Sequence, residues 1–551
     1  MENMTWRARL AAAWKKGLGL ALVLVVAAVL RSQHIKADPP AILPFISGSA
    51  GIYFDEGIYC HNARNKILFG RWITDEWNPL VYNAPLTLIY YLGFRLFGIS
   101  IVTVKAINIF FGLLGILLFH AGLRQYLGSG RSLALTSLFA FDYYWLMYNR
   151  IGLLENYSAL CFLLCFYLFA RSEEGRWSAY FLGLTAAFAA LSKYMFVYFL
   201  ISTLLAVAYR AWRRSDARSF IIFLAGVFTA WLPWFVAIYL PFRSTFSKIA
   251  HGWEMLAFPR SISKAWSNMM HNPSPRYLQL MPVVSFLLVL FVAWTLLKLG
   301  RTRTSGREPK DLTIFIFLWI AGGAFSMGFL NYRPLRYYLP LIPALYLAVS
   351  ILVRDRDWIR SKSRLSWPLA ILPAILFFWF FPILGTRHSA FLAFPLVLRL
   401  LIFLSLAGVM MSIAIPNRTW KKAVDAAVFV VMLGCSLYLY DIQFYQKPTY
   451  NLEEASRFIE TLPAGSVLMG QEAPRLALGT RFKTFLAYDN WFNYRDPFKR
   501  LAPTHLLILD KFDNAERDWI RRRFPQVVAS LHLIRRFRVW DTTISLYRVP
   551  E

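Results

Sequence analysis

The chain has 551 residues, of which 58% are hydrophobic and 17% aromatic, and its mean hydropathy is +0.45. Soluble globular chains contain about 45–50% apolar residues, so the composition excludes an ordinary soluble protein and indicates a polytopic membrane protein. The net charge of +30 raises the question of nucleic acid, but Lys and Arg cluster in short loops between apolar runs. The positive-inside rule and anionic lipid headgroups both favour that pattern. We therefore expect no nucleic-acid partner.

The basic loops define a predicted topology for residues 1–446. Each crossing needs about 20 apolar residues in a helix. When every basic loop is placed in the cytoplasm, the chain contains about thirteen spans. The first span is expected at about 17–37, as an uncleaved signal anchor with its N-terminus in the cytoplasm. The fold class is therefore mostly α, with a helical membrane core, and the plasma membrane of a bacterium is the compartment that the pattern suits.

The first outer loop, 38–100, follows this span and carries two adjacent acids, Asp55 and Glu56. Acids beside a membrane span are usually retained for a function, because hydrocarbon does not solvate them. The alternative is a solvated loop that contains two acids by chance. An inward span is expected at 101–123, which leaves 56–69 and 85–97 as helices lying along the membrane surface.

Further charged residues fall at the predicted outer ends of later helices. Lys193 interrupts the apolar stretch 177–209, which predicts two short helices with an outer turn between them. The guanidinium group of Arg binds phosphate through two hydrogen bonds, and the ammonium group of Lys adds a point charge. Carboxylates act as bases or orient an acceptor. Snorkelling to the headgroups is the alternative for each cation. The expected outer set is Asp55, Glu56, Arg150, Glu155, Lys193, Arg333 and Arg336, and His251 and His271 lie in an outer loop where they are either incidental or line a site.

The composition changes at about 447, where the long apolar runs end. Helices are predicted at 451–462 and 514–524, and buried strands at 466–469, 505–509, 527–531 and 543–547. Residues 447–551 are thus expected to form a small extracytoplasmic α/β domain.

Several catalytic templates have no match in the chain. There is no Gly-rich phosphate loop, no His-Glu-x-x-His zinc motif and no Gly-x-Ser-x-Gly elbow. The four cysteines have no zinc-site spacing and imply no disulfide framework. No metal ligands are therefore assigned and no cofactor is required, although a divalent metal stays open.

An ordered set of short motifs resembles GT-C-fold glycosyltransferases of the protein mannosyltransferase and aminoarabinose transferase type. In those families a span is followed by an Asp-Glu pair, a surface helix, a Pro-Leu element and a Phe-Gly turn. The matching residues are Phe54-Asp55-Glu56-Gly57-Ile58-Tyr59, Asn62-Ala63-Arg64, Gly70-Arg71-Trp72, Asn83-Ala84-Pro85-Leu86, Leu96-Phe97-Gly98, Arg150 with Glu155, Leu191-Ser192-Lys193, and Arg336-Tyr337-Tyr338-Leu339-Pro340. The resemblance covers about 450 residues.

The resemblance implies inverting transfer of a sugar from a polyprenyl-phosphate donor in the membrane to a lipid, glycan or protein acceptor at the outer face. Asp55 would be the base, with Glu56 and Glu155 as further acidic site residues. The donor phosphate would be bound by Arg150, Lys193 and Arg336. The aminoarabinose branch carries Lys-Pro-Pro or similar where this chain has Asn83-Ala84-Pro85, so one phosphate-binding lysine is missing, and Tyr82 or Arg64 would replace it. The substrate would also be lined by Tyr59, Tyr82, Asn83, Tyr337, Tyr338 and His271.

A transporter or flippase of a lipid-linked sugar is the alternative from another class, because intramembrane charges suit it as well. Transporters often show matching halves with broken helices at the midplane, and no such pairing is visible in the sequence. A non-catalytic scaffold, in which Asp55 would be dispensable, is a third hypothesis.

Overall fold

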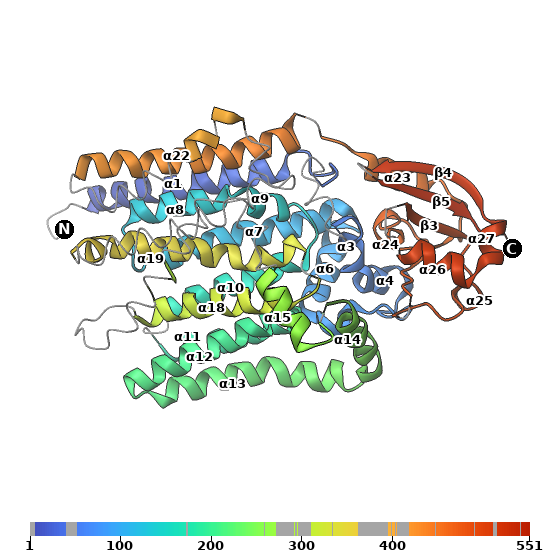
Figure 1. The fold of residues 1–551 in the computed structure, drawn as a ribbon, viewed down its shortest axis with the longest axis horizontal. Helices are drawn as coiled ribbons and strands as arrows, with labels where there is room; N and C mark the ends of the chain where they lie inside the picture. The colour runs from blue at the N-terminus through green and yellow to red at the C-terminus, as the bar shows by residue number, and fades with distance from the viewer. Residues whose placement is uncertain are drawn as a thin grey trace.

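The computed structural model contains a long helical bundle with a small sheet domain at one end (Figure 1). The N-terminus lies at the end of the bundle far from the sheet, and the C-terminus lies in the sheet domain. The structure describes residues 6–39, 52–171, 175–257, 259–271, 310–332, 334–361, 418–446, 448–489, 491–510, 515–539 and 542–550, with a few short pieces between 291 and 404.

The bundle begins with α1 (Trp6–Ser32), so the predicted first span at 17–37 is helical as far as Ser32. Helix α7 (Ile101–Leu123) corresponds to the span expected at 101–123, and the hydroxyl of Ser100 accepts a hydrogen bond from the Thr103 amide at its start. Such a cap satisfies one of the amides that a helix N-terminus leaves unpaired. The following helices are α8 (Ser129–Ala140), α9 (Tyr143–Tyr148) and α10 (Leu154–Arg171).

The chain breaks at Lys193, between α11 (Arg176–Ser192) and a short 3-10 turn, Tyr194–Phe196, that leads into α12 (Val197–Arg214). The break predicted in the stretch 177–209 is therefore confirmed. The backbones of α11 and α13 (Ala217–Trp234) approach closely at Gly183 and Gly226, where an added Cβ would overlap the facing carbonyl oxygen. Small residues at such crossings are typical of helices packed in lipid.

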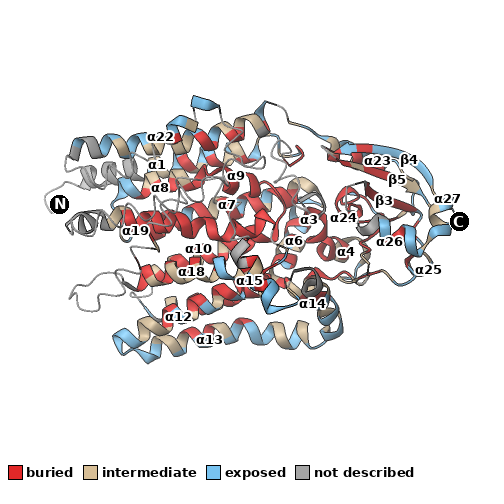
Figure 2. Cartoon of the chain, in the orientation of Figure 1, coloured by how far each residue is buried: buried red, intermediate tan, exposed pale blue. Residues whose placement is uncertain are grey.

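The later described helices of the membrane part are α14 (Arg243–Ala257), α15 (Ile262–His271), α18 (Lys310–Phe329), a 3-10 helix Leu335–Leu341, α19 (Ile342–Ser361) and α22 (Arg418–Tyr440). Within the described residues, 6 helical stretches are long and apolar enough to cross a membrane. Figure 2 shows that buried residues fill the centre of the bundle, whereas α13 is largely exposed. Ile221 and Phe228 on α13 are 63% and 56% exposed, as expected for side chains that face lipid. The chain is an integral membrane protein, and the expected total of about thirteen spans stays a prediction, since parts of 272–417 lie outside the described residues.

The predicted first outer loop, 38–100, is called the first outer segment from here on. Its described residues 52–100 form the short helices α3 (Ile52–Ile58), α4 (His61–Phe69), α5 (Pro79–Tyr82) and α6 (Ala84–Phe97). Gly70 ends α4 with a positive φ of 72°, which suits glycine because it has no Cβ. With 14 residues, α6 is shorter than the roughly 20 residues that a crossing needs. The helices expected at 56–69 and 85–97 are thus present, although Cys60 interrupts the first.

The C-terminal part contains a five-stranded sheet in the order β2-β1-β3-β5-β4. Its strands are β1 (Val467–Met469), β2 (Lys483–Phe485), β3 (His505–Asp510), β4 (His532–Val539) and β5 (Thr542–Arg548). The first three pair in parallel, whereas β5 runs antiparallel to both β3 and β4. The helices of this part are α23 (Asn451–Glu460), α24 (Ala473–Leu476), α25 (Pro497–Leu501), α26 (Ala515–Arg523) and α27 (Pro525–Ser530).

The predicted α/β composition is confirmed, but one predicted strand is wrong. Residues 527–531 lie mostly in α27, which starts with Pro525 in its first turn, where a proline costs no hydrogen bond. The strand follows instead at β4, an edge strand of the sheet. It is mostly exposed and carries three arginines, so it lacks the buried apolar run that marks β1 and β3. The three-residue strand β2 was also not predicted, because it is too short to show an alternating pattern.

Candidate active site

Asp55 lies at the centre of a buried group of charges. Its Oδ2 atom is 3.1 Å from Nε of Arg336, at the start of the 3-10 helix before α19. Burial raises the pKa of Asp55 to about 7, although the nearby charge of Arg336 opposes this rise. A carboxyl group with such a pKa is a much better proton acceptor near neutral pH than an ordinary aspartate.

A second ion pair lies beside the first. Nζ of Lys193 is 2.8 Å from Oε1 of Glu155, and the same oxygen is 3.9 Å from Nε of Arg336. Lys193 Nζ also lies 3.8 Å from the ring centroid of Tyr337, where the aromatic face attracts a cation. The break between α11 and α12 places Lys193 here, and the first turn of α10 places Glu155 here. Two cations and two carboxylates thus converge from four separated segments.

Glu56, the second acid of the pair, points away from this group of charges. Its Oε1 atom accepts a hydrogen bond of 3.1 Å from the Gly152 amide, and its Oε2 atom is 3.5 Å from Nε of Arg475. Adjacent residues of a helix point in different directions, so Asp55 and Glu56 have different partners. Arg475 belongs to α24 in the C-terminal part, so this contact joins the two parts of the chain.

An apolar cavity of about 810 Å³ adjoins the charges. Lys193 lines it together with Tyr59 and Tyr82 from the first outer segment. The remaining wall is mostly hydrophobic and comes from α11, α12, α13 and α14, with Leu191, Val197, Val227, Trp231, Trp234 and Phe246 among its members. A cavity with apolar walls and one cationic side suits an amphipathic ligand that carries a negative headgroup.

Three polar side chains in and between α5 and α6 are buried and have no hydrogen-bond partner among the described residues. They are the hydroxyl of Tyr82, both amide atoms of Asn83 and the hydroxyl of Thr87. Buried polar groups are normally paired, so unpaired ones in a native structure call for an explanation such as a ligand. Tyr337 and Tyr338 are both buried in the 3-10 helix that carries Arg336, and the hydroxyl of Tyr337 also lacks a hydrogen-bond partner.

Two expected phosphate-binding residues lie elsewhere. Arg150 donates to the carbonyl oxygens of Leu30 and His34 and to the Tyr440 hydroxyl, and thereby ties the end of α1 to α22. Arg64 donates to the carbonyl oxygens of Ala477, Leu478, Thr480 and Phe482, and burial lowers its pKa to about 10. The structure therefore does not bring Arg64 or Arg150 into the group around Asp55. The side chain of His271 and all of Arg333 lie outside the described residues.

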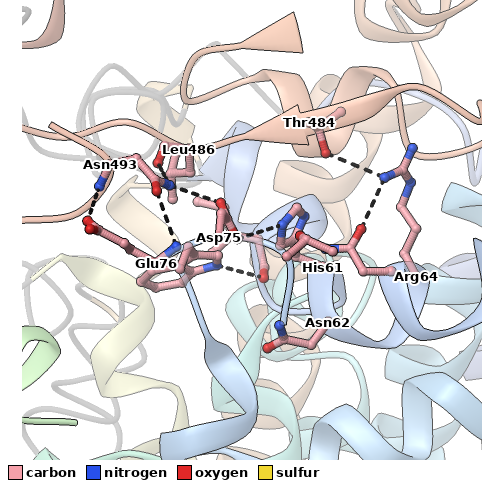
Figure 3. Close-up of polar contacts among 12 residues, drawn as sticks. His61, Asn62, Arg64, Asp75, Glu76, Thr484, Leu486 and Asn493 are labelled. Atoms are coloured by element: carbon pink, nitrogen blue, oxygen red, sulfur yellow. Dashed lines mark hydrogen bonds and ion pairs between the residues drawn. The ribbon is translucent and has the colours of Figure 1, made fainter. Parts of the chain in front are cut away.

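The outer segment and the C-terminal part share a second polar contact, shown in Figure 3. His61 Nε2 lies 3.4 Å from Asp75, and Asn493 donates to Asp75 at 2.9 Å. The backbone N–H of Asn493 also donates to a carboxylate oxygen of Glu76. These residues were not singled out by sequence reasoning, and neither were Glu472 and Arg475. No local pattern could have revealed the contacts between the two parts of the chain, since Asn493 and Asp75, for example, lie 418 residues apart.

The fold is of the GT-C type. A family model for dolichyl-phosphate-mannose-protein mannosyltransferase matches residues 84–239, which is less than half of the chain. No curated protein matches the sequence. The expected resemblance to GT-C-fold glycosyltransferases is confirmed by this match and by similar solved structures.

Two solved structures are of ArnT from Cupriavidus metallidurans, one bound to undecaprenyl phosphate and one in the apo state. They are 17% identical in sequence, with TM-scores of 0.55 and 0.57, and the matches cover 97% and 98% of this chain and 98% of each ArnT chain. A third is the archaeal oligosaccharyltransferase AglB from Archaeoglobus fulgidus in complex with an inhibitory peptide and a dolichol-phosphate. It is 11% identical with a TM-score of 0.50, covering 90% of this chain and 70% of AglB. At these identities the similarity establishes the fold.

Proposed function

We propose that the protein is an inverting glycosyltransferase that moves a sugar from a polyprenyl-phosphate donor to an acceptor at the outer membrane face. The observation that carries this proposal is the convergence of Asp55, Glu155, Lys193 and Arg336 beside an apolar cavity of about 810 Å³. The similar ArnT and AglB structures hold undecaprenyl phosphate and a dolichol-phosphate, respectively. The matched family model is likewise named for a transferase with a lipid-phosphate sugar donor.

The donor would occupy the cavity with its lipid tail along α11, α12 and α13. Trp231 and Trp234 supply large apolar surfaces there. The phosphate would reach Lys193, which lines the cavity, and Arg336. Both cations lie close to the carboxylate of Glu155. Both cations are paired with carboxylates, Arg336 with Asp55 and Lys193 with Glu155, which holds them in position for the phosphate.

In the transfer step, Asp55 accepts the proton of the acceptor hydroxyl as that oxygen attacks the anomeric carbon. The bond from the anomeric carbon to the phosphate oxygen breaks on the opposite face of the sugar, which inverts the configuration. A single displacement of this kind needs one carboxylate near the acceptor, whereas retention needs a nucleophile as well. The phosphate leaves as an anion, and Lys193 and Arg336 stabilise its developing charge.

The unpaired polar groups of Tyr82, Asn83 and Thr87 would take hydroxyl groups of the sugar. All of them are neutral, which suits hydrogen bonding to a polyhydroxylated ligand. The C-terminal part would lie on the outer side, above the acceptor. The sugar and acceptor would be identified by mass spectrometry of the lipids and glycans that change when the protein is removed.

The deciding experiment is the substitution Asp55→Asn in the full-length protein. It preserves the shape of the side chain but removes its ability to accept a proton. We expect the variant to insert, fold and bind undecaprenyl phosphate but to lose transfer. Full transfer by Asp55→Asn would overturn the assignment, and movement of a lipid-linked sugar across vesicles without a covalent product would favour a flippase.

A further inference from the structure

The C-terminal part contacts the segment that carries Asp55 at very short range. Helix α24 packs against α3, and a Cβ on Gly57 would overlap the backbone nitrogen of Arg475. Only glycine allows such an approach of two backbones without displacement. The position of Asp55, two residues before Gly57, is therefore tied to the position of α24.

Arg475 places a buried charge at this contact. Its Nε atom is 3.5 Å from Oε2 of Glu56, and both side chains are at most 2% exposed. Its Nη1 atom donates to the hydroxyl of Ser456 in α23, which anchors the guanidinium within the C-terminal part. Removing one member of a buried ion pair leaves an uncompensated charge, which is strongly unfavourable.

Glu56 also contacts the membrane part of the chain. Its other oxygen, Oε1, accepts the hydrogen bond from the Gly152 amide, in the loop that leads into α10 and Glu155. Arg475, Glu56 and Gly152 thus form a continuous link between α24 and that loop. The two acids beside Arg336 are close in sequence to this contact. Asp55 directly precedes Glu56, and Glu155 follows shortly after Gly152.

We propose that Arg475 is a positioning residue of the active site, through which the C-terminal domain holds Glu56 and thereby fixes Asp55 relative to Glu155. This inference rests on the proposed function of Asp55. It makes the C-terminal domain a required part of the catalytic unit, although Arg475 contacts Glu56 and acts on Asp55 only through it. Loss of the link lets α3 shift, and small displacements of a catalytic group lower the rate much more than they lower binding.

The test compares Arg475→Met and Arg475→Lys with Arg500→Met in full-length protein. Arg500 is a matched control, because it also forms an Arg–Glu pair between the C-terminal domain and the first outer segment, at 3.3 Å from Glu76. Hydrogen exchange of the amides in 52–58 and 150–154 reports the link without any substrate. Turnover and the Kd for undecaprenyl phosphate are measured on the same samples.

We expect Arg475→Met to increase amide exchange in both segments at least tenfold and to lower kcat at least tenfold. The Kd for undecaprenyl phosphate should stay within twofold, and Arg475→Lys should restore part of kcat. For Arg500→Met, the amide exchange rates, kcat and the Kd for undecaprenyl phosphate should all stay within twofold of the unmodified protein. In a Glu56→Gln background, Arg475→Met should add little, because the link is already broken.

Equal effects of Arg475→Met and Arg500→Met, or effects of Arg475→Met and Glu56→Gln that simply add, would overturn the inference. Its failure is distinct from failure of the proposed function. If Asp55→Asn loses transfer while Arg475→Met retains it, only the positioning role is wrong. If Asp55→Asn retains transfer, the proposed function is wrong, and the exchange data still decide whether the link exists.

Discussion

Nε of Arg336 lies 3.1 Å from Oδ2 of Asp55, with both side chains buried. The same nitrogen is 3.9 Å from Oε1 of Glu155, so one guanidinium contacts the proposed base and the acid that holds Lys193. Each charge in this group therefore has an opposite charge nearby, which is the condition for keeping charges in a buried site. The arrangement also places the proposed base beside a group that would bind the leaving phosphate.

Replacing Arg336 should therefore impair catalysis more than donor binding. Arg336→Met removes a cation that would stabilise charge developing on the phosphate. Removing one such donor typically costs about 100–1,000-fold in rate, so we expect a loss of that order in kcat. The kcat of Arg336→Lys should lie between those of Arg336→Met and the unmodified protein, because lysine keeps the positive charge but lacks the planar guanidinium group. A kcat unchanged by Arg336→Met, with normal protein levels, would exclude this role.

The rate of transfer should depend on pH through Asp55. Burial raises its pKa to about 7, and only the deprotonated carboxylate accepts a proton. We expect kcat/KM to rise with pH and to level off above about 7. Because Arg336 opposes the rise of this pKa, Arg336→Met should move the ascending part of the profile to higher pH. A profile that is flat from about pH 5.5 to 8 would contradict Asp55 as the base.

Lys193 should govern donor binding. We expect Lys193→Met to weaken the binding of undecaprenyl phosphate about 10–100-fold, since a hydrogen bond to a charged group contributes about 1.5–3 kcal/mol. Lys193→Arg should bind within a few-fold of the unmodified protein. Lys66→Met is the control, because the ammonium group of Lys66 donates to the Gly70 carbonyl and does not line the cavity. Equal affinities for Lys193→Met and Lys66→Met would place the phosphate elsewhere.

Glu472 predicts a pH-dependent stability. It is fully buried, neither of its carboxylate oxygens has a hydrogen-bond partner in the described part of the chain, and burial raises its pKa from 4.5 to about 8. The unfolded chain releases this proton near pH 4.5, whereas the folded chain retains it until about pH 8. The contribution of Glu472 to the free energy of unfolding is therefore full below pH 4.5 and declines as pH rises to 8.

The substitution Glu472→Gln keeps the shape of the protonated acid and does not titrate. Its melting temperature relative to the unmodified protein should therefore increase between pH 5 and pH 8, by an amount worth at least about 1 kcal/mol. Glu454→Gln, on the exposed side of α23, is the control for loss of a carboxylate. A difference between Glu472→Gln and the unmodified protein that does not change with pH would contradict this prediction.

The positions of the helices could be predicted well from the sequence where local chemistry decides them. The apolar run at 101–123 and the interruption at Lys193 each appear as expected, because hydrocarbon tolerates only helices and a charge marks where a helix leaves it. The strands β1 and β3 were also predicted, since each is a short buried apolar run, and β5, in which apolar and polar residues alternate, was predicted as well. The strand β4 was missed because most of its residues are exposed and it contains no buried apolar run.

The residue pattern showed which residues are chemically unusual: two acids beside a span, and cations among apolar helices. It did not determine their partners. Arg64 and Arg150 looked equivalent to Lys193 and Arg336, yet the former two bind backbone carbonyls at helix ends. Only the tertiary structure separated them, and it also brought Arg475 to Glu56, because an ion pair depends on distances set by packing between segments far apart in the chain. Asp55 and Glu56 are adjacent acids in the sequence, and they have different partners for the same reason.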